Sequence, residues 1–459
     1  MQKRIEQLIT ASFDAYRLSG KDRVEFYELT LSMLAWSALS QYITKTDSAL
    51  YKILMPPGQE FFFNHVMMQV NHPEHKFMVE KALWEWEREN DQVLKGLLQL
   101  DSNHIRSIPE AAWLRICALW LDLFNLNDTI PIIDHLEDQI LRSRLDIVTP
   151  KELSRIMVDL LNDNNNTSLY DPYCRSGDLL SSAAREMGKL NKIHGLSTGR
   201  LPWKLSKLRL LLLDLPAKIE IDKGFERPYL ENTAKFDTII LNPPFGSYGQ
   251  DPYYQPSLVE GPWSWFASKS NRSEIIYLCH VLDHLSDKGR AAVIVPTIFL
   301  SGQGGIKELR KQIIQQNILD AVITLPPGIF SQTGVFTAIL IFNKDRKQDK
   351  VFMLDAAKLA VKDGKQVYLE ETKVNQFILQ FKEQQYSSNE HTRVLTIAEI
   401  EGHDHDLQFS VYDISDDLFI EKLIPAAEIL DECKHLEDEL KQVRVRIATL
   451  LESRQHSVS

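Results

Sequence analysis

Apolar residues recur at helical spacing through the first third of the chain. Tyr27, Leu31, Leu34 and Ala38 follow one another at intervals of three or four positions, and the run from Val79 to Leu100 continues similarly. This is the period of an amphipathic α-helix, so residues 1–145 are predicted to form an all-helical domain. Five of the eight tryptophans lie in this region and are expected to pack between its helices: Trp36, Trp84, Trp86, Trp113 and Trp120.

From about residue 146 the pattern changes to short apolar runs that alternate with amphipathic stretches. Such alternation is typical of βαβ units in a parallel sheet with helices on both faces. We assign residues 146–350 to this α/β domain and residues 351–420 to an extension of it. The predicted strands are 168–170, 192–197, 219–222, 238–241, 291–296, 320–325 and 336–342, the last of the sheet, and the predicted helices are 201–213, 274–285 and 306–318.

The end of the chain, residues 421–459, carries a heptad repeat. Apolar positions are spaced alternately four and three residues apart, with charged residues between them, at Ile429, Cys433, Leu436, Leu440, Val443, Ile447 and Leu450. About three heptads suffice for a helix that pairs with another chain. A helix that docks on the body of this chain explains the pattern equally well.

One polar tip stands out within the α/β pattern. The apolar or β-branched run Thr238–Leu241 leads directly into Asn242, Pro243, Pro244 and Phe245. Each proline fixes its own φ and restricts the residue before it, so the strand ends here and leaves Asn242 at its carboxyl end. Open α/β sheets place their ligands at that edge.

These four residues suit a narrow kind of chemistry. The side-chain carbonyl of Asn242 and the main-chain carbonyl of Pro243 can accept both hydrogens of one planar amine, while Phe245 stacks on the attached ring. The nitrogen lone pair is then drawn out of ring conjugation, and the amine becomes a nucleophile without a strong base. A simple turn after a strand is the alternative interpretation, because Asn and Pro are ordinary turn residues.

A second loop follows the predicted strand at 168–170. Its sequence, Asp171-Pro172-Tyr173-Cys174-Arg175-Ser176-Gly177, precedes a helical run. Strand, tight turn and helix follow one another in this way at nucleotide-type cofactor sites, where small residues let the backbone approach the ligand. Only one glycine is present and Arg175 is bulky, so a generic strand-to-helix turn also fits.

A helix start is predicted just before this loop. Thr149 is placed as N-cap, Pro150 at the first helical position and Glu152 three residues after Thr149. This arrangement is a capping box, which satisfies the free amide groups at the start of a helix.

The stretch from Gly246 to Arg272 is rich in aromatic residues interleaved with bases. A long loop beside a site often carries function, and aromatic side chains with bases can stack on a single extruded nucleotide. A loop that packs on its own aromatics is an equally good interpretation. The aromatic and basic residues are Tyr248, Tyr253, Tyr254, Trp263, Trp265, Phe266, Lys269 and Arg272.

Composition and charge restrict these interpretations. With 459 residues, 44% of them hydrophobic and 25% charged, the chain is typical of a globular protein of two or three domains. Its formal net charge of -11 argues against binding nucleic acid by bulk electrostatics, so any DNA contact must be local or come from a basic partner. The four cysteines are far apart, which favours neither a disulfide framework nor a zinc site and fits a reducing cytoplasm. No signal sequence or membrane span is expected, so we predict a cytoplasmic protein.

Taken together, these segments resemble the N6-adenine DNA methyltransferases, and specifically the modification subunit of type I restriction-modification systems. The loop from Asp171 to Gly177 is similar to the Asp-Pro-x-Cys-Gly-Ser-Gly loop of that family, and Asn242–Phe245 is similar to its catalytic tetrapeptide. Val148-Thr149-Pro150 matches the helix-opening segment beside the cofactor. His403–Asp406, which alone invites a metal interpretation, falls in the family's closing signature and so receives a structural role. Other similar segments lie at 19–39, 271–274, 289–296, 325–334 and 400–412.

The resemblance implies a fold and a reaction. The fold is an α/β, Rossmann-like S-adenosylmethionine-dependent methyltransferase domain, preceded by an all-helical domain and followed by a coiled-coil-like helix. The donor is S-adenosylmethionine, and the acceptor is an adenine flipped out of double-stranded DNA. Asn242, Pro243 and Pro244 would form the catalytic tip with Phe245, which would stack on the base. The residues implied for cofactor binding are Thr149, Asp171, Cys174, Ser176, Gly177, Ser197, Asp222 and Asn242; no metal is implied.

The resemblance also implies partners. The chain is acidic and has no long insertion that could recognise a target sequence, so a separate specificity subunit is expected to read the DNA. The heptad helix is the natural place to meet it, in a hetero-oligomer that could also include a restriction subunit.

Two residues depart from the family pattern. Arg175 stands where the family loop has glycine, and Ser197 stands where the family has an acidic residue that binds the ribose. The loss of two hydrogen bonds to a ribose would weaken donor binding by about 1 to 3 kcal/mol. Arg175 could block the pocket or pair with the carboxylate of the donor. Two alternatives therefore stay open: a weak or inactive methyltransferase-like scaffold, and a methyltransferase acting on protein glutamine or RNA.

Overall fold

The chain divides by its internal contacts into two units, Met1–Phe409 and Ser410–Ser459. The computed structural model describes residues 1–42, 53–101, 103–126, 129–144, 149–162, 167–188, 190–215, 217–222, 234–246, 261–330, 333–364, 366–384, 387–412, 438 and 440–443. In the second unit Leu440 and Val443 are exposed, and the other heptad positions lie outside the described residues. The predicted domain limits and the heptad pairing therefore stay predictions.

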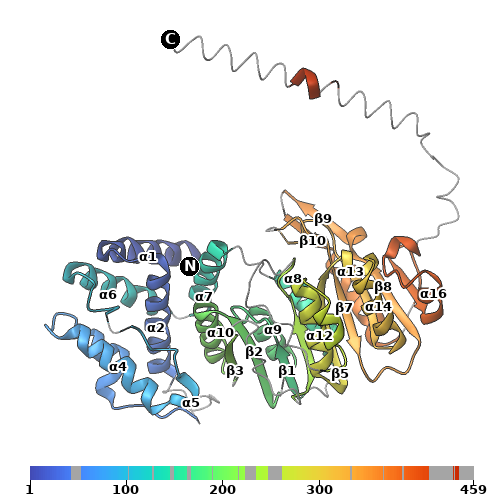
Figure 1. Ribbon diagram of the computed structural model, residues 1–459. Helices are drawn as coiled ribbons and strands as arrows, with labels where there is room; N and C mark the ends of the chain where they lie inside the picture. The colour runs from blue at the N-terminus through green and yellow to red at the C-terminus, as the bar shows by residue number, and fades with distance from the viewer. Residues whose placement is uncertain are drawn as a thin grey trace. The chain divides into compact units, whose positions relative to one another are not determined.

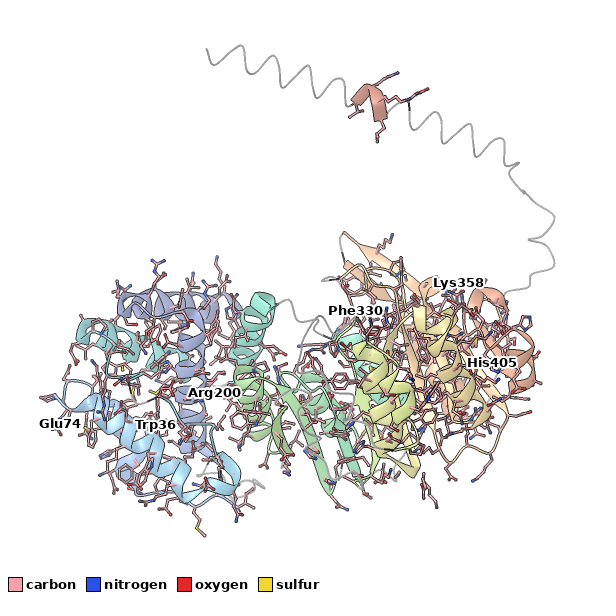
Figure 2. The ribbon with its side chains drawn as sticks, viewed as in Figure 1. Trp36, Glu74, Arg200, Phe330, Lys358 and His405 are labelled. Atoms are coloured by element: carbon pink, nitrogen blue, oxygen red, sulfur yellow. The ribbon has the colours of Figure 1, made fainter. Side chains whose placement is uncertain are left out.

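The first part of the chain is helical, as predicted. Its buried centre includes Trp36 and Trp86, whose indole nitrogens both donate to the carbonyl of Phe61, at 2.9 and 3.0 Å. Figure 1 shows these helices in blue to cyan, and Figure 2 labels Trp36 among them. The helices are α1 (Gln2–Tyr16), α2 (Arg23–Tyr42), α3 (Phe63–Met67), α4 (His75–Glu89), α5 (Asp91–Leu94), α6 (Glu110–Phe124) and α7 (Ile130–Arg144).

Trp84 does not follow the prediction for the tryptophans. Trp36, Trp86, Trp113 and Trp120 are fully buried, whereas Trp84 is 54% exposed. Leu83 and Trp86 direct one face of α4 into the core, which leaves the position between them on the outer face. There Trp84 stacks under the guanidinium of Arg88, one helical turn later, at 4.8 Å.

A nine-stranded mixed sheet forms the second part, with strand order β11-β8-β6-β7-β5-β4-β1-β2-β3. Strand β7 runs antiparallel between β5 and β6, while β3, β2, β1, β4 and β5 are parallel. The strands are β1 (Ser168–Asp171), β2 (Lys192–Thr198), β3 (Ala217–Asp222), β4 (Phe236–Leu241), β5 (Leu285–Pro296), β6 (Leu319–Thr324), β7 (Thr337–Asn343), β8 (Lys350–Asp355) and β11 (Thr392–Thr396).

Helices cover both faces of this sheet. Successive residues of β4, from Thr238 to Leu241, all have 0% exposure, which requires cover on both sides, as predicted. Helices α8, α9 and α10 pack side by side, and α8 and α12 both contact β5 (Figure 1). The helices of this part are α8 (Lys151–Leu161), α9 (Asp178–Glu186), α10 (Arg200–Leu212), α11 (Ser264–Ser268), α12 (Ser273–His284), α13 (Ile298–Ser301), α14 (Gly305–Gln315), α15 (Glu371–Lys382) and α16 (Ile397–Gly402).

The prediction that 336–342 is the last strand is wrong. β8 pairs with β6 beyond β7, β11 closes that edge, and β9 (Ala360–Asp363) and β10 (Gln366–Leu369) form a separate two-stranded sheet. These strands are short, between four and six residues, and β9, β10 and β11 lie in a polar stretch where the apolar periodicity is weak.

The predicted capping box is also wrong. The residue that precedes α8 is Pro150, and no side chain caps the helix. The Thr149 hydroxyl instead accepts a hydrogen bond from Asn242, and the Glu152 carboxylate accepts one from the amide of Leu369. Both candidate capping side chains therefore have partners far away in the sequence.

The helical part is joined to the β3 end of the sheet through α10, which contacts α2 and α7 (Figure 1). The Lys204 ammonium of α10 is fully buried and donates to the hydroxyl of Ser32 at 2.8 Å and to the carbonyl of Gln99 at 3.2 Å. Burial lowers the pKa of Lys204 to about 8.

The segment His403–Asp406 follows α16 and is tied to α14. Arg310, which is 1% exposed, donates to the carbonyl of His405 at 2.9 Å, and Lys307 pairs with Asp404 at 2.5 Å. Figure 2 labels His405 in this region. Within the described residues, no helix is both long and apolar enough to cross a membrane.

Candidate active site

The two predicted loops meet at one edge of the sheet. Strand β1 pairs with β2 on one side and with β4 on the other, so the strand order reverses here. In open α/β sheets this switch point leaves a crevice at the carboxyl ends of the strands. The loop that follows Asp171 and the tip that follows Leu241 share that edge.

The tip presents a buried acceptor. Asn242 is 1% exposed, and its side-chain nitrogen donates to the hydroxyl of Thr149 at 2.9 Å. The side-chain oxygen of Asn242 is buried too, but it has no hydrogen-bond partner among the described residues. Because an unpaired buried carbonyl costs free energy, this oxygen is suited to an incoming N–H donor.

The segment after the tip is anchored to the start of α12. The amide of Gly246 donates to the Glu274 carboxylate at 3.0 Å, and the amide of Ser273 donates to the carbonyl of Gly246 at 3.0 Å. Arg272 pairs with the same carboxylate at 2.5 Å. The backbone directly after Phe245 is therefore fixed to the start of α12. Phe245 itself is partly exposed.

Most of the aromatic loop, residues 247–260, lies outside the described residues. Of the part that is described, Trp263 is buried and Trp265 is 54% exposed. Whether this loop touches a nucleotide stays a prediction.

The loop after β1 is clamped onto β2. The amide of Cys174 donates to the carbonyl of Leu196 at 2.8 Å, and the hydroxyl of Ser197 donates to the carbonyl of Arg175 at 2.7 Å. Ser197 is fully buried. Its hydroxyl hydrogen is therefore used to hold the loop.

Gly177 ends this loop at the start of α9. Its φ of 78° is left-handed, and an added Cβ would lie 2.8 Å from the hydroxyl oxygen and 3.1 Å from the Cα of Ser206. Both conditions require glycine. The thiol of Cys174 also faces α10, 3.6 Å from the hydroxyl of Ser206, and burial raises its pKa well above the ordinary value.

Asp171 is a buried carboxyl with an unusual pKa. It is 1% exposed and accepts from the amide of Tyr173 at 2.9 Å. Burial raises its pKa from 3.8 to about 7, although that hydrogen bond and the charge of Arg175 act in the opposite direction. The carboxyl of Asp171 can therefore change charge near neutral pH.

Ser176 connects the loop to the helical part. Its hydroxyl donates to the carboxylate of Glu137 in α7, which Arg209 of α10 also binds, at 2.6 Å. Burial raises the pKa of Glu137 to about 7 against the opposing charge of Arg209. The sequence did not identify Glu137 or Arg209, because neither belongs to a local motif.

Comparison with known proteins assigns the chain to a family. Residues 142–417 match the description N-6 DNA methylase. The chain belongs to the N-6 DNA methylase family.

Relatives of this methylase-family chain agree with that assignment. The EcoEI methylase subunit of a type I restriction enzyme of Escherichia coli is 28% identical over 222 residues, 45% of this chain and 44% of that protein. The MpnII methylase subunit of a type I restriction enzyme of Mycoplasma pneumoniae is 25% identical over 260 residues, 52% of this chain and 48% of that protein. The aligned part spans about half the length of these relatives.

Solved structures confirm the fold of the methylase-family chain. The methyltransferase subunit of a type I restriction-modification system of Streptococcus thermophilus superposes with a TM-score of 0.68 at 17% identity, covering 88% of this chain and 98% of that one. A chain from a structural study of complex assembly in the type I system has a TM-score of 0.62 at 18% identity and covers 99% of both chains. The predicted α/β methyltransferase fold with a helical front part is therefore correct.

Most of the site residues predicted for the methylase lie at this one edge. Asn242–Phe245 follow β4, Asp171 ends β1 and leads into the loop to Gly177, Ser197 is the penultimate residue of β2, and Thr149 is tied to Asn242. Asp222 ends β3, opposite Thr198 of β2, and its side chain lies outside what the structure describes. Their roles toward a donor or a base remain predictions.

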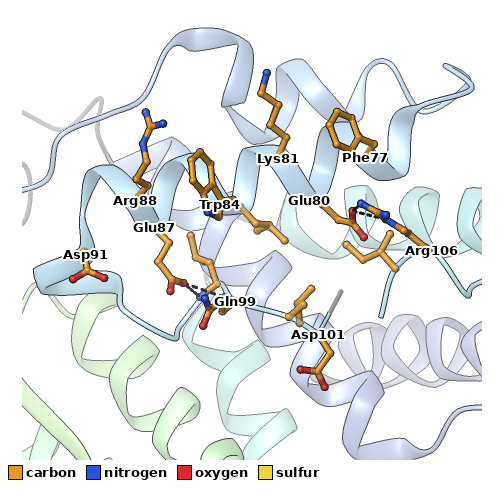
Figure 3. A pocket seen from close by; sticks show the side chains of 14 residues that line it. Phe77, Glu80, Lys81, Trp84, Glu87, Arg88, Asp91, Gln99, Asp101 and Arg106 are labelled. Atoms are coloured by element: carbon orange, nitrogen blue, oxygen red, sulfur yellow. Dashed lines mark hydrogen bonds and ion pairs between the residues drawn. The ribbon is translucent and has the colours of Figure 1, made fainter. Parts of the chain in front are cut away.

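A separate hollow of about 710 Å³ lies in the helical part of the methylase (Figure 3). Two of its acidic side chains have partners: Glu87 accepts from the amides of Gly96, Leu98 and Gln99, and Glu80 binds Arg106. None of the predicted site residues lines it. Its exposed apolar lining, Phe77 and Trp84, suits packing rather than reaction chemistry.

Proposed function

We propose that the chain is a DNA methyltransferase subunit that transfers a methyl group from S-adenosylmethionine to the N6 amine of an adenine flipped out of double-stranded DNA. The observation that carries this proposal is the buried side-chain oxygen of Asn242, which has no hydrogen-bond partner in the described part of the chain and follows a strand next to β1. Membership of the N-6 DNA methylase family supports it.

Residues of the chain itself position the adenine. The side-chain oxygen of Asn242 and the carbonyl of Pro243 accept the two hydrogens of the amine, and Phe245 stacks on the base. Thr149 holds the other end of the Asn242 amide, so this group is fixed before substrate arrives. The ordered loop from Asp171 to Gly177 is the donor side of the same edge. Bound S-adenosylmethionine would supply an electrophilic methyl group there and would leave as the neutral thioether S-adenosylhomocysteine, with the electron pair of the broken S–C bond on sulfur. The methylated amine loses its proton to water.

Recognition of the target sequence is assigned to a partner. A net charge of -11 opposes attraction of the whole chain to the DNA backbone, so a basic specificity subunit is expected to supply most phosphate contacts. We place the contact with this subunit on the heptad residues 421–459. A restriction subunit would complete a larger hetero-oligomer, as relatives named for type I restriction enzymes suggest.

A second candidate is a methyltransferase-like scaffold with weak or no activity. The observation that favours it is at Ser197, whose side chain has no carboxylate for a ribose and whose hydroxyl already holds Arg175. Calorimetry of S-adenosylmethionine binding separates the candidates. Micromolar binding excludes the scaffold, and no binding excludes the enzyme.

The reaction itself is tested with tritiated S-adenosylmethionine, unmethylated DNA and the chain assembled with its specificity subunit. Label is expected on N6 of adenine, and Asn242→Ala should lower the rate about 10²- to 10³-fold because a fixed acceptor is lost. Asn64→Ala, on the exposed face of α3, is the matched control. Label found on protein glutamine or RNA by mass spectrometry, with none on DNA, would contradict the proposal.

A further inference from the structure

We propose that the guanidinium of Arg175 binds the carboxylate of the donor's amino-acid part and makes the chain selective for donors that carry this carboxylate. The inference rests on the proposed function, because it concerns the same loop after β1.

Arg175 is a buried cation that has no anionic partner among the residues that the structure describes. The residue is 6% exposed, and its Nε is buried with no hydrogen-bond partner among the described residues. No carboxylate in that part of the chain lies within ion-pair distance of it; the charge of Asp171 is felt only at longer range. A buried guanidinium nitrogen without a partner, on a cation that has no anion beside it, is costly, so this position favours an anionic ligand.

The side chain is held in place for such a ligand. The guanidinium lies over the ring of Tyr173, 4.6 Å from its centroid, and that ring in turn packs edge-on against Tyr277 at 5.4 Å. The backbone is fixed as well, because the carbonyl of Arg175 accepts from Ser197. A stacked guanidinium keeps its edge free for a planar, two-pronged hydrogen bond to a carboxylate.

The charges of the ligand decide which of its groups meets Arg175. S-adenosylmethionine carries a sulfonium, an ammonium and one carboxylate at neutral pH, so only the carboxylate is attracted by a guanidinium. Asp171, four residues earlier in the same loop, has the charge that suits the ammonium or the sulfonium. The neighbouring acid and base thus complement the two charges of an amino-acid group.

The alternative, that the Arg175 side chain closes the donor pocket, makes an opposite prediction. A plug obstructs every ligand that enters the pocket, whether or not the ligand carries a carboxylate. Removal of a plug should therefore raise the affinity for all such ligands.

Two ligands that differ only in this group test the proposal: S-adenosylmethionine and decarboxylated S-adenosylmethionine, titrated calorimetrically into the full chain. The wild type should bind the carboxylated ligand about 10- to 100-fold more tightly, the range expected for a charged hydrogen-bonded pair. Arg175→Gly should lose this preference through weaker binding of S-adenosylmethionine, with little change for the decarboxylated ligand.

The variants are chosen so that the backbone is preserved. The φ of Arg175 is 47°, which glycine adopts freely, so Arg175→Gly keeps the loop conformation while it removes the side chain. Arg175→Lys keeps the charge but not the planar fork and should retain an intermediate preference. Arg185→Ala, exposed in the last turn of α9, changes the net charge equally and should leave both affinities unchanged.

The outcomes separate this proposal from the proposed function. Tighter binding of both ligands by Arg175→Gly, equal weakening of both, or equal binding of both by the wild type would each overturn the role of Arg175 while donor binding stands. No binding of either ligand by the wild type would overturn the proposed function and this inference with it.

Discussion

Removal of Arg209 should destabilise the protein in a pH-dependent manner. Its guanidinium is 7% exposed and binds Glu137 at 2.6 Å and Asp134 at 2.8 Å, both on α7. Glu137 is itself buried and also accepts from Ser176 in the loop after β1. Arg209→Leu removes the cation while it keeps apolar bulk, so a buried carboxylate is left without its counter-charge.

The magnitude follows from the charge of Glu137. The pKa of this carboxyl is raised from 4.5 to about 7 with Arg209 present, and the loss of the cation would raise it further. At pH 8 wild-type Glu137 is ionised, and a buried pair that loses one partner costs about 3–5 kcal/mol. At pH 5.5 the Glu137 carboxyl already carries its proton, so a hydrogen bond from the guanidinium to a neutral carboxyl is lost instead of an ion pair, and the cost falls to about 1–3 kcal/mol.

Urea denaturation of wild type and Arg209→Leu at pH 8 and pH 5.5 measures both losses. A raised carboxyl pKa reduces stability as pH rises from the unfolded value of 4.5 to the folded value, so wild type and variant lose stability together up to about pH 7. Above that pH the variant, whose Glu137 pKa lies higher, continues to lose stability, so it should improve relative to wild type as pH falls from 8. Arg209→Leu combined with Glu137→Gln should recover most of the loss at pH 8, since no buried charge remains. Equal losses at the two pH values would refute this account of the cluster.

Three further predictions concern the site. Thr149→Val leaves the side-chain nitrogen of Asn242 as a buried donor without an acceptor, so the free energy of unfolding should fall by about 1–3 kcal/mol and methylation should be slower. Thr149→Ser should restore the stability and the rate, whereas an unchanged melting temperature and rate in Thr149→Val would contradict the prediction. S-adenosylmethionine should bind more tightly as pH rises from 6 to 8, because the cationic ligand favours ionised Asp171, whose pKa in the free protein is about 7. Calorimetry of Asp171→Asn should show an affinity that does not change with pH, and a wild-type affinity that is equally constant would exclude the effect. Gly177→Ala should lower the free energy of unfolding by about 2 kcal/mol or more through its left-handed φ and the contact with Ser206; Ser206→Ala added to it should relieve the steric part, and a fully stable single variant would argue against the contact.

The sequence predicted what depends on neighbouring residues. The strand that ends at Leu241 and the tip at Asn242 were predictable because two consecutive prolines stop a buried strand at a definite residue. The parallel pairing of β1 with its neighbours followed from the βαβ rhythm of apolar runs and amphipathic stretches. In each case the residues that determine the structure lie within a short segment of the chain.

The remaining contacts depend on distant parts of the chain. Thr149 looked like a helix cap, because the sequence does not show that Asn242, 93 residues later, would take its hydroxyl. Glu137 belongs to an ordinary amphipathic helix until the loop at Ser176 is folded against it. The edge strand β11 and its neighbour β8 were missed; β11 pairs antiparallel with β8, and β8 pairs parallel with β6, which are contacts that the sequence does not show.

The hydrogen bond between Thr149 and Asn242 bears on how the chain can be dissected. β1 starts at Ser168, so a fragment cut to the parallel sheet would retain the whole tip and lose the side chain that holds its amide. The smallest piece able to present a fixed acceptor must therefore begin before α8. A search for minimal catalytic fragments should extend the amino-terminal boundary to include Thr149, even where the sheet alone folds.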